Sequence, residues 1–175
     1  LWHFVQGGTD LEKRNRELVR DAHSQCQITH GHLCNQVCCA LYCLAAQGLL
    51  EGKEAREAIQ EGVCVLRSIY REQPEYEREL EWSVRPDIPW EGRGTGYVVD
   101  CLRSAFMILE QTSDYEDAIK RAVLLGNDTD TTACVTGGLA GIRYGLRKIP
   151  ERWLNGLKER EKVEDLLAQL EKRHS

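Results

Sequence analysis

Two aspartates and a threonine stand close together in the stretch GNDTDTTACVTGGLAG, residues 126–141. Asp128 and Asp130 are two residues apart, so on one helix their side chains would point to opposite sides. If Asp128 lies just before a helix and Asp130 lies in its first turn, both carboxylates can converge on one point, where the Thr131 hydroxyl can join them. Such an all-oxygen set is the ligand chemistry of Mg²⁺, Mn²⁺ or Ca²⁺ rather than of zinc.

Helix capping is the alternative explanation of the same aspartates. Asp128 as an N-cap would stabilise the helix by about 1 kcal/mol, and Asp130 would add a favourable charge at the positive helix end. Capping leaves Gly137, Gly138 and Gly141 unexplained. Because each glycine inside a helix costs about 1 kcal/mol relative to alanine, we expect neighbouring backbones to approach this helix closely.

A second candidate site lies in HGHLCNQVCC, where His30, His32, Cys34 and Cys38 could supply nitrogen and sulfur ligands to zinc. The chain has eight cysteines, and half of them fall within residues 34–43, a segment with helical spacing. Pairs four residues apart on one helix cannot easily form a disulfide. The favoured interpretation is that these cysteines are reduced, buried, small hydrophobic residues of a cytoplasmic protein.

Length, charge and hydropathy limit the class of protein. A chain of 175 residues can bury one sizeable core, so we expect a single domain over residues 1–175. The net charge of -5 and the pI near 5.6 argue against a nucleic-acid groove, which needs clustered Lys and Arg. No apolar run approaches the roughly 20 residues of a membrane span, so neither nucleic acid nor a membrane is an expected partner.

Helical spacing of apolar residues runs through almost the whole sequence, and no alternating strand pattern occurs. The fold class is therefore predicted to be all-α, a compact multi-helix bundle. Capping boxes at Thr9–Glu12 and Ser113–Glu116 predict two helix starts, and the Pro- and Gly-rich residues 72–96 predict a long loop in which Trp82 and Trp90 are half-buried anchors. Helices are expected over residues 11–26, 32–48, 55–70, 98–109, 115–123, 148–157 and 158–174, together with a Gly-rich helix that starts at the Asp128–Asp130 motif.

The run GNDTDTTACVTGGLAGIRYGLRKIPERWL resembles the C-terminal signature of the ADP-ribosylglycohydrolase family, closest to the branch typified by dinitrogenase-reductase-activating glycohydrolase. Three other stretches resemble family segments in the same order: SQCQITHGH, GRGTGYVVDCLRSAF and DYEDAIKRAVLLGNDTDTTA. The resemblance covers most of the chain. It implies an all-α enzyme that uses two divalent metal ions, magnesium or manganese, to release ADP-ribose from a modified side chain of a protein, arginine in this branch.

The resemblance also implies roles for individual residues. Asp128, Asp130 and Thr131 match the family's C-terminal metal ligands, and His30 matches a histidine near the diphosphate of the bound ADP-ribose. Metal ions there would hold the ribose hydroxyls and activate the attacking water. No residue is assigned as the catalytic acid or base.

The Gly-rich loop before residue 98 carries the rest of the implied substrate site. Thr95, Gly96 and Tyr97 match the loop that lines the nucleotide, and the Tyr97 ring offers a stacking face. We expect these residues and His30 to line one concavity that faces the Asp128–Thr131 motif.

The chain departs from the family pattern in its first part. The family places further metal ligands in an N-terminal T-D-D stretch after a glycine-rich opening, and this sequence has no two adjacent aspartates. Its start, LWHFVQGG, corresponds to an interior portion of the family's chain. A fragment, a site shared with another polypeptide and a natural truncation are the possible explanations. Each leads us to expect little activity from this chain alone, and apolar surface that favours self-association or pairing with a missing N-terminal segment.

A different class of function is open on the same fold. The family resemblance extends to some lens crystallins, so a non-catalytic ADP-ribose-binding protein or a structural protein is the alternative. The D-x-D-T motif argues against a purely structural protein, which has no need for it.

Overall fold

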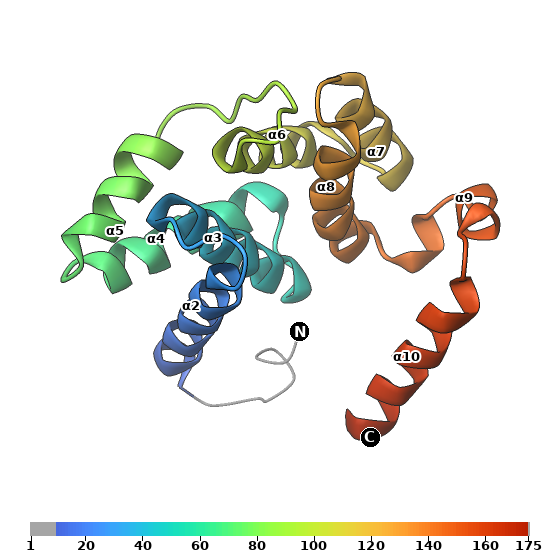
Figure 1. Cartoon of the computed structure of the whole chain (residues 1–175), viewed down its shortest axis with the longest axis horizontal. Coiled ribbons are helices and arrows are strands. Elements are labelled where there is room, and N and C mark those ends of the chain that lie inside the picture. Colours follow the sequence, from blue (N-terminus) through green and yellow to red (C-terminus); the bar gives the residue numbers. More distant parts are fainter. Residues whose placement is uncertain (1–9, 175) are drawn as a thin grey trace.

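The computed structural model describes residues 10–174, which are helical almost throughout and contain no strand (Figure 1). The predicted all-α fold is therefore confirmed. The α-helices are α2 (Leu11–Gln27), α3 (Leu33–Leu50), α4 (Ala55–Tyr70), α5 (Pro74–Arg78), α6 (Val98–Gln111), α7 (Tyr115–Leu124), α8 (Thr129–Tyr144), α9 (Glu151–Gly156) and α10 (Arg160–His174). A π-helix, η1 (Glu79–Val84), and a short 3-10 helix, η2 (Leu146–Lys148), complete the set.

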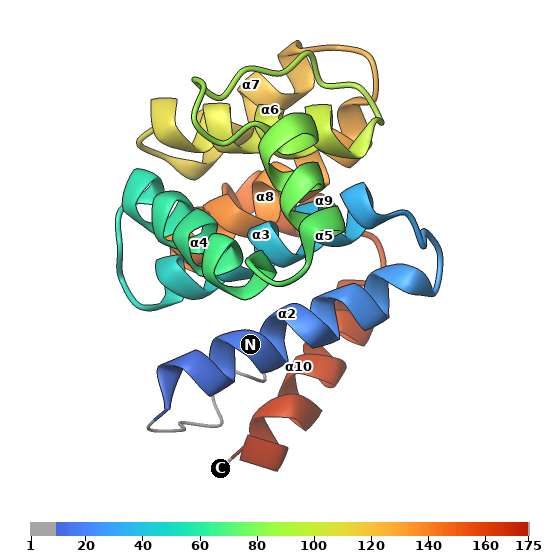
Figure 2. The same cartoon turned by 90° about the vertical axis from the view of Figure 1, so that its left-hand side faces the viewer.

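The central helix is α3, which packs against α2, α4, α6, α8 and η1. Figure 2 shows α6 and α7 above the level of α3, α4 and α8, and α2 below it. Val37, Leu41 and Ala45 of α3 are fully buried. Complete burial of a Val or Leu side chain stabilises the fold by about 1.5–3 kcal/mol. At Gly48, α3 crosses α4 so closely that an added Cβ would lie 3.0 Å from the Ala58 Cα.

The apolar character of α3 corrects one expectation from the sequence. The sequence led us to expect no apolar run long enough to span a membrane. By length and composition alone, however, α3 could cross one. Within the protein 61% of it is buried. Its position as the core helix of the bundle accounts for an apolar composition on nearly every side.

Two helix starts differ by one residue from the predicted capping boxes. Asp10 caps α2, where its carboxylate accepts a hydrogen bond from the Lys13 amide at 3.1 Å. Asp114 caps α7 and accepts from the Asp117 amide at 2.8 Å. Thr9 lies outside the described residues. An aspartate caps as well as Ser or Thr and adds a negative charge at the positive helix end, so the following aspartate replaces Ser113 as the cap.

The first half of the predicted loop over residues 72–96 is helical, so that part of the prediction is wrong. Pro74 occupies the first turn of α5, a position where its missing amide hydrogen costs nothing. The π-helix η1 follows, and buries Leu80 and Val84 completely. Burial of these two side chains holds the segment on the core.

The irregular residues 85–97 are anchored by Arg103 of α6. Its guanidinium donates hydrogen bonds to the carbonyl oxygens of Val84, Arg85, Pro89 and Glu91. It also lies 5.0 Å from the centre of the Trp90 ring, which meets Phe106 edge-on. Trp90 is thus the predicted anchor, whereas Trp82 is 79% exposed and anchors nothing.

The last helix, α10, stands apart from the bundle in Figure 1. Its apolar side chains Val163, Leu166 and Leu167 are exposed. The structure therefore leaves an apolar helix face without cover among the residues it describes.

Candidate functional site

Asp128 is the residue before α8, and Asp130 lies in the first turn of that helix. The Thr131 hydroxyl, and then the Asp130 side chain, lower the pKa of the Asp128 carboxyl. Asp128 and Asp130 thus have the positions relative to α8 that the spacing requires, and their convergence on a metal ion stays a prediction. Asp128 makes no N-cap hydrogen bond of good geometry, and the Thr131 amide makes the smallest contribution to its lowered pKa. Capping alone does not explain this residue.

The loop before α6 packs directly against the Asp128 carboxylate. A Cβ added at Gly96 would lie 2.4 Å from Asp128 Oδ2, so only glycine fits there without moving the carboxylate. The Asp128 amide donates to the Gly94 carbonyl at 2.9 Å, and Asn127 Nδ2 donates to the Arg93 carbonyl at 2.9 Å. Two segments more than thirty residues apart therefore form one structural unit.

Asp100, in the first turn of α6, holds the other side of this loop. Its carboxylate accepts hydrogen bonds from the Arg93 amide at 3.0 Å, the Thr95 amide at 2.7 Å and the Thr95 hydroxyl at 2.8 Å. Burial raises the pKa of Asp100, but the hydrogen bonds from Thr95 and Arg93 outweigh it and lower the pKa. The Thr95 side chain is thus bound to Asp100, a residue that the sequence reasoning missed.

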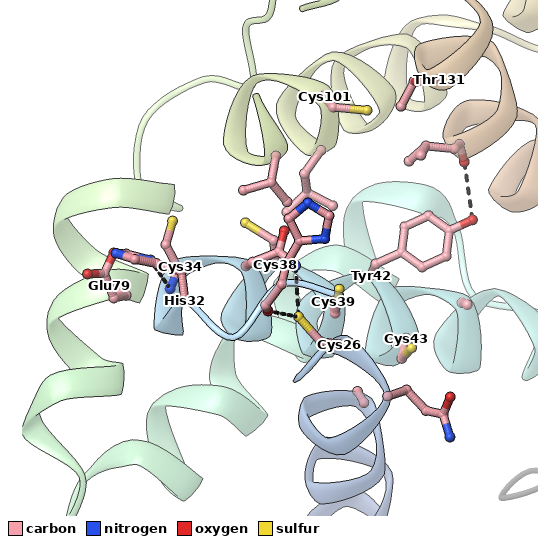
Figure 3. Close-up of a pocket in the computed structure, with 18 of the residues that line it drawn as sticks. Cys26, His32, Cys34, Cys38, Cys39, Tyr42, Cys43, Glu79, Cys101 and Thr131 are labelled. Carbon is pink, nitrogen blue, oxygen red and sulfur yellow. Dashed lines mark hydrogen bonds between the residues drawn. The ribbon is translucent and has the colours of Figure 1, made fainter. Parts of the chain in front are cut away.

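A cavity of about 1390 Å³ opens between α2, α3, η1, α6 and α8 (Figure 3). Four residues of the predicted site line it: His30, Gly96, Tyr97 and Thr131. The Tyr97 ring is 61% exposed, so its face is open to a ligand. Thr95, Asp128 and Asp130 are not lining residues, and Asp128 lies behind Gly96. The structure thus brings part of the predicted set to one concavity, while the roles of these residues stay predictions.

Cysteine side chains form much of the cavity wall, and all eight cysteines are free thiols. Burial raises the pKa of Cys39 to about 12, so this thiol is neutral at pH 7 and behaves as an apolar group. Burial also raises the pKa of Cys43. Of the four cysteines predicted to be buried, Cys34 and Cys38 are buried, whereas Cys39 and Cys43 are only partly buried. Cys64 and Cys134, outside that segment, are exposed.

The residues considered as zinc ligands have other partners. His32 is the N-cap of α3, and its Nδ1 accepts from the Cys34 amide at 3.1 Å. His30 Nδ1 lies 3.0 Å from the Thr29 hydroxyl. Among the side chains that the structure describes, those of residues 10–169, no three of His, Cys, Asp or Glu come together as a metal-binding group. Metal binding at Asp128 would thus need oxygen ligands of another kind, such as the Thr131 hydroxyl.

The glycines of α8 approach side chains, among them Ile119 at Gly137, and not the neighbouring backbones that the sequence led us to expect. A Cβ at Gly138 would lie 2.3 Å from Tyr42 Oη, which donates to the Val135 carbonyl at 3.2 Å. A Cβ at Gly141 would meet only Tyr115, at an ordinary 3.9 Å. Of these two glycines, only Gly138 is therefore required by its contacts.

The protein is an all-α bundle with two aspartates at the start of one helix. A glycine-rich loop and a large cavity lie beside them. The sequence model of the ADP-ribosylglycohydrolase family matches residues 5–175, and the chain belongs to that family. A solved structure described as an ADP-ribosylglycohydrolase-related protein complex superposes with a TM-score of 0.67 at 30% identity. The match covers 86% of this chain and 51% of that chain.

Two curated relatives agree with this family. The ADP-ribosylarginine hydrolase Tri1 of Serratia proteamaculans is 30% identical over 162 residues, which are 90% of this chain and 42% of the relative. The ADP-ribosyl-[dinitrogen reductase] glycohydrolase of Rhodospirillum rubrum is 26% identical over 134 residues, 77% of this chain and 41% of the relative. The chain thus spans less than half the length of these two relatives.

Proposed function

We propose that this chain carries part of an active site that hydrolyses the glycosidic bond between ADP-ribose and a modified side chain of a protein. The observation that supports this most is the contact between Gly96 and the Asp128 carboxylate beside the cavity. It joins the predicted nucleotide loop to the predicted metal motif in one rigid unit. Arginine is the proposed modified residue, because Tri1 is named an ADP-ribosylarginine hydrolase. The proposed setting is the cytoplasm.

The chemistry of the oxygen donors fits a hard divalent cation, magnesium or manganese. Asp128, Asp130 and Thr131 would hold it, because carboxylate and hydroxyl oxygens are the donors that such a cation prefers. When bound, two such ions would hold the ribose hydroxyls and activate a water molecule. About six oxygens surround each magnesium ion, so these ligands fill only part of a shell. Waters or a segment outside this chain would supply the rest.

The cavity walls offer what an ADP-ribose moiety requires. Tyr97 presents an exposed ring on which adenine or ribose can stack. Within residues 93–97, the amides of Arg93 and Thr95 donate to Asp100 and that of Gly94 donates to Ser104. The amides of Gly96 and Tyr97 are left as donors to a diphosphate, with His30 on another wall of the same cavity. Because the Thr95 hydroxyl donates its hydrogen bond to Asp100, we propose that Thr95 holds the conformation of the loop and does not bind the ligand directly.

Calorimetry with ADP-ribose and Mn²⁺, followed by an assay for release of ADP-ribose from ADP-ribosyl-arginine, tests the proposal. We expect Mn²⁺-dependent binding that is lost in Asp128→Asn. We expect slow release by the chain alone and faster release once the family's N-terminal segment is added. The shortage of ligands favours, as an alternative, a protein that binds ADP-ribose without hydrolysis, in which case the added segment would not raise release. Absence of binding by the chain with the segment added would contradict both functions and leave a crystallin-like structural protein.

A further inference from the structure

A buried glutamine of α3, Gln36, is hydrogen-bonded to the loop that carries His30. Gln36 is 2% exposed, and its Nε2 donates to the carbonyl of Gly31 at 2.9 Å. Its Oε1 accepts two hydrogen bonds, from Tyr76 Oη at 3.0 Å and from Gln27 Nε2 at 3.1 Å. A single amide group therefore joins the connection between α2 and α3 to α5.

One of the connected segments belongs to the cavity wall, and the other, α5, adjoins it. His30, Gly31 and His32 line it from the α2–α3 connection, and Glu79 lines it from η1, which follows α5 directly. In Figure 3, His32 and Glu79 stand at the same end of the cavity. Gln36 therefore ties the α2–α3 wall of the cavity to the helix that directly precedes its η1 wall.

The partners of Gln36 are themselves held rigidly. The Tyr76 ring stacks on His23 at 4.8 Å with an interplanar angle of 3°. His23 Nε2 lies 2.8 Å from the hydroxyl of Tyr70, which is fully buried. Tyr76 is thus a fixed support for Gln36.

A second contact holds the carbonyl next to Gly31. The Cys26 thiol donates to the His30 carbonyl at 3.1 Å, and Asn35 Nδ2 donates to the Cys26 sulfur at 2.8 Å. A thiol is a weak donor, so the amide of Gln36 is the stronger of the two restraints on this connection.

We propose that Gln36 is a positioning residue of the cavity, which fixes the connection carrying His30 against α5 and thereby sets where His30 meets the ligand. The role of His30 rests on the proposed function, but the restraint on the connection does not. An apolar side chain of similar length at residue 36 would leave the Gly31 carbonyl and the Tyr76 hydroxyl without their partner.

Gln36→Met tests the proposal, with hydrogen exchange at the Thr29 and His30 amides as the main readout. Both amides donate to the Cys26 carbonyl, so their exchange reports on this connection. We expect exchange about tenfold faster there, as for one lost buried hydrogen bond, and ADP-ribose binding weakened about fivefold or more. The matched control is Gln60→Met, at an exposed glutamine of α4, which is expected to leave exchange within twofold of the unaltered chain.

A second variant covers the case in which Gln36→Met does not fold. Gln36→Asn keeps an amide but is one methylene too short to span Gly31 and Tyr76 together, and we expect the same local increase in exchange. Unchanged exchange at Thr29 and His30 in any folded variant of Gln36 would overturn the proposal, as would an equal increase in the control. If the unaltered chain binds no ADP-ribose even with the N-terminal segment added, the proposed function fails, while the exchange rates still decide the role of Gln36.

Discussion

Gly96 lies against the carboxylate of Asp128, with no room for a side chain between them. An added Cβ would come within 2.4 Å of Asp128 Oδ2, and the Asp128 amide is tied to Gly94 on the same loop. The direction of this carboxylate is therefore set by a loop far away in the sequence. A substitution in that loop should therefore alter the geometry of the proposed metal site, although the ligands themselves are not substituted.

Gly96→Ala should push the Asp128 carboxylate away and weaken Mn²⁺ binding about tenfold or more, the size of effect seen when the support of a metal ligand is altered. The free energy of unfolding should change little, since the displaced atom is the end of a side chain. Metal titration by electron paramagnetic resonance and thermal unfolding measure the two quantities. Gly156→Ala is the control, because nothing lies within 4 Å of its added Cβ. Equal metal affinity in both variants would contradict the prediction.

Two glycines of α8 should respond in opposite ways to alanine. Gly141→Ala should stabilise the protein by up to about 1 kcal/mol, because alanine is the better helix former and its Cβ makes an ordinary contact. Gly138→Ala should displace Tyr42 Oη and break its bond to Val135. We expect the unfolding free energies of the two variants to differ by about 1–2 kcal/mol. Denaturant unfolding checks this, and equal values would show that Tyr42 moves without cost.

Arg103 should be essential for the order of residues 85–97. It is 8% exposed and satisfies carbonyls from Val84 to Glu91. Arg103→Met should therefore cost about 3 kcal/mol of unfolding free energy, because several buried acceptors lose their donor. Arg103→Lys should rescue little of it, since an ammonium group cannot reproduce the planar set of donors. Arg56→Met, at an exposed ion pair, is the control and should change stability by less than about 0.5 kcal/mol. A mild effect at Arg103 would mean that other contacts hold the loop.

The hydrogen bonds to Asp100 should make stability depend on acid pH. The folded protein lowers the pKa of Asp100 below its ordinary value of 3.8, so the unfolded chain binds this proton at higher pH than the folded chain. The contribution of Asp100 is then complete at pH values well above 3.8 and is lost as the pH falls through the lowered pKa. Asp100→Asn should be less stable than the unaltered chain at pH 7. Chemical unfolding between pH 7 and pH 2.5 should show the difference shrinking toward acid pH, and a constant difference would contradict this.

Local patterns in the sequence predicted most of the fold because they reflect local physics. Apolar spacing located the main helices, and the D-x-D-T spacing placed Asp128 before α8 with Asp130 in its first turn. The errors occurred where two local signals compete. Asp114 displaced Ser113 as a cap, and Pro74 started a helix although the surrounding Pro and Gly residues indicated a loop.

The parts of the candidate site that depend on distant contacts could not be predicted in this way. Nothing in GRGTGYVVD shows that Asp100 holds Thr95, although an acidic residue just after a glycine-rich loop is a signal that could have been used. Likewise, no local pattern reveals that Gln36 joins the Gly31 carbonyl to Tyr76, because Tyr76 lies 40 residues away in the sequence. Such residues emerge only when the helices are packed together.

A crystal structure of the chain soaked with Mn²⁺ and ADP-ribose, with anomalous scattering to locate the metal, is the most direct test of the proposed site. We predict an anomalous peak within about 2.5 Å of oxygens from Asp128, Asp130 and Thr131, with ADP-ribose against the Tyr97 ring in the cavity that His30 lines. A metal bound elsewhere, or ADP-ribose bound away from Gly96 and Tyr97, would contradict the proposed site.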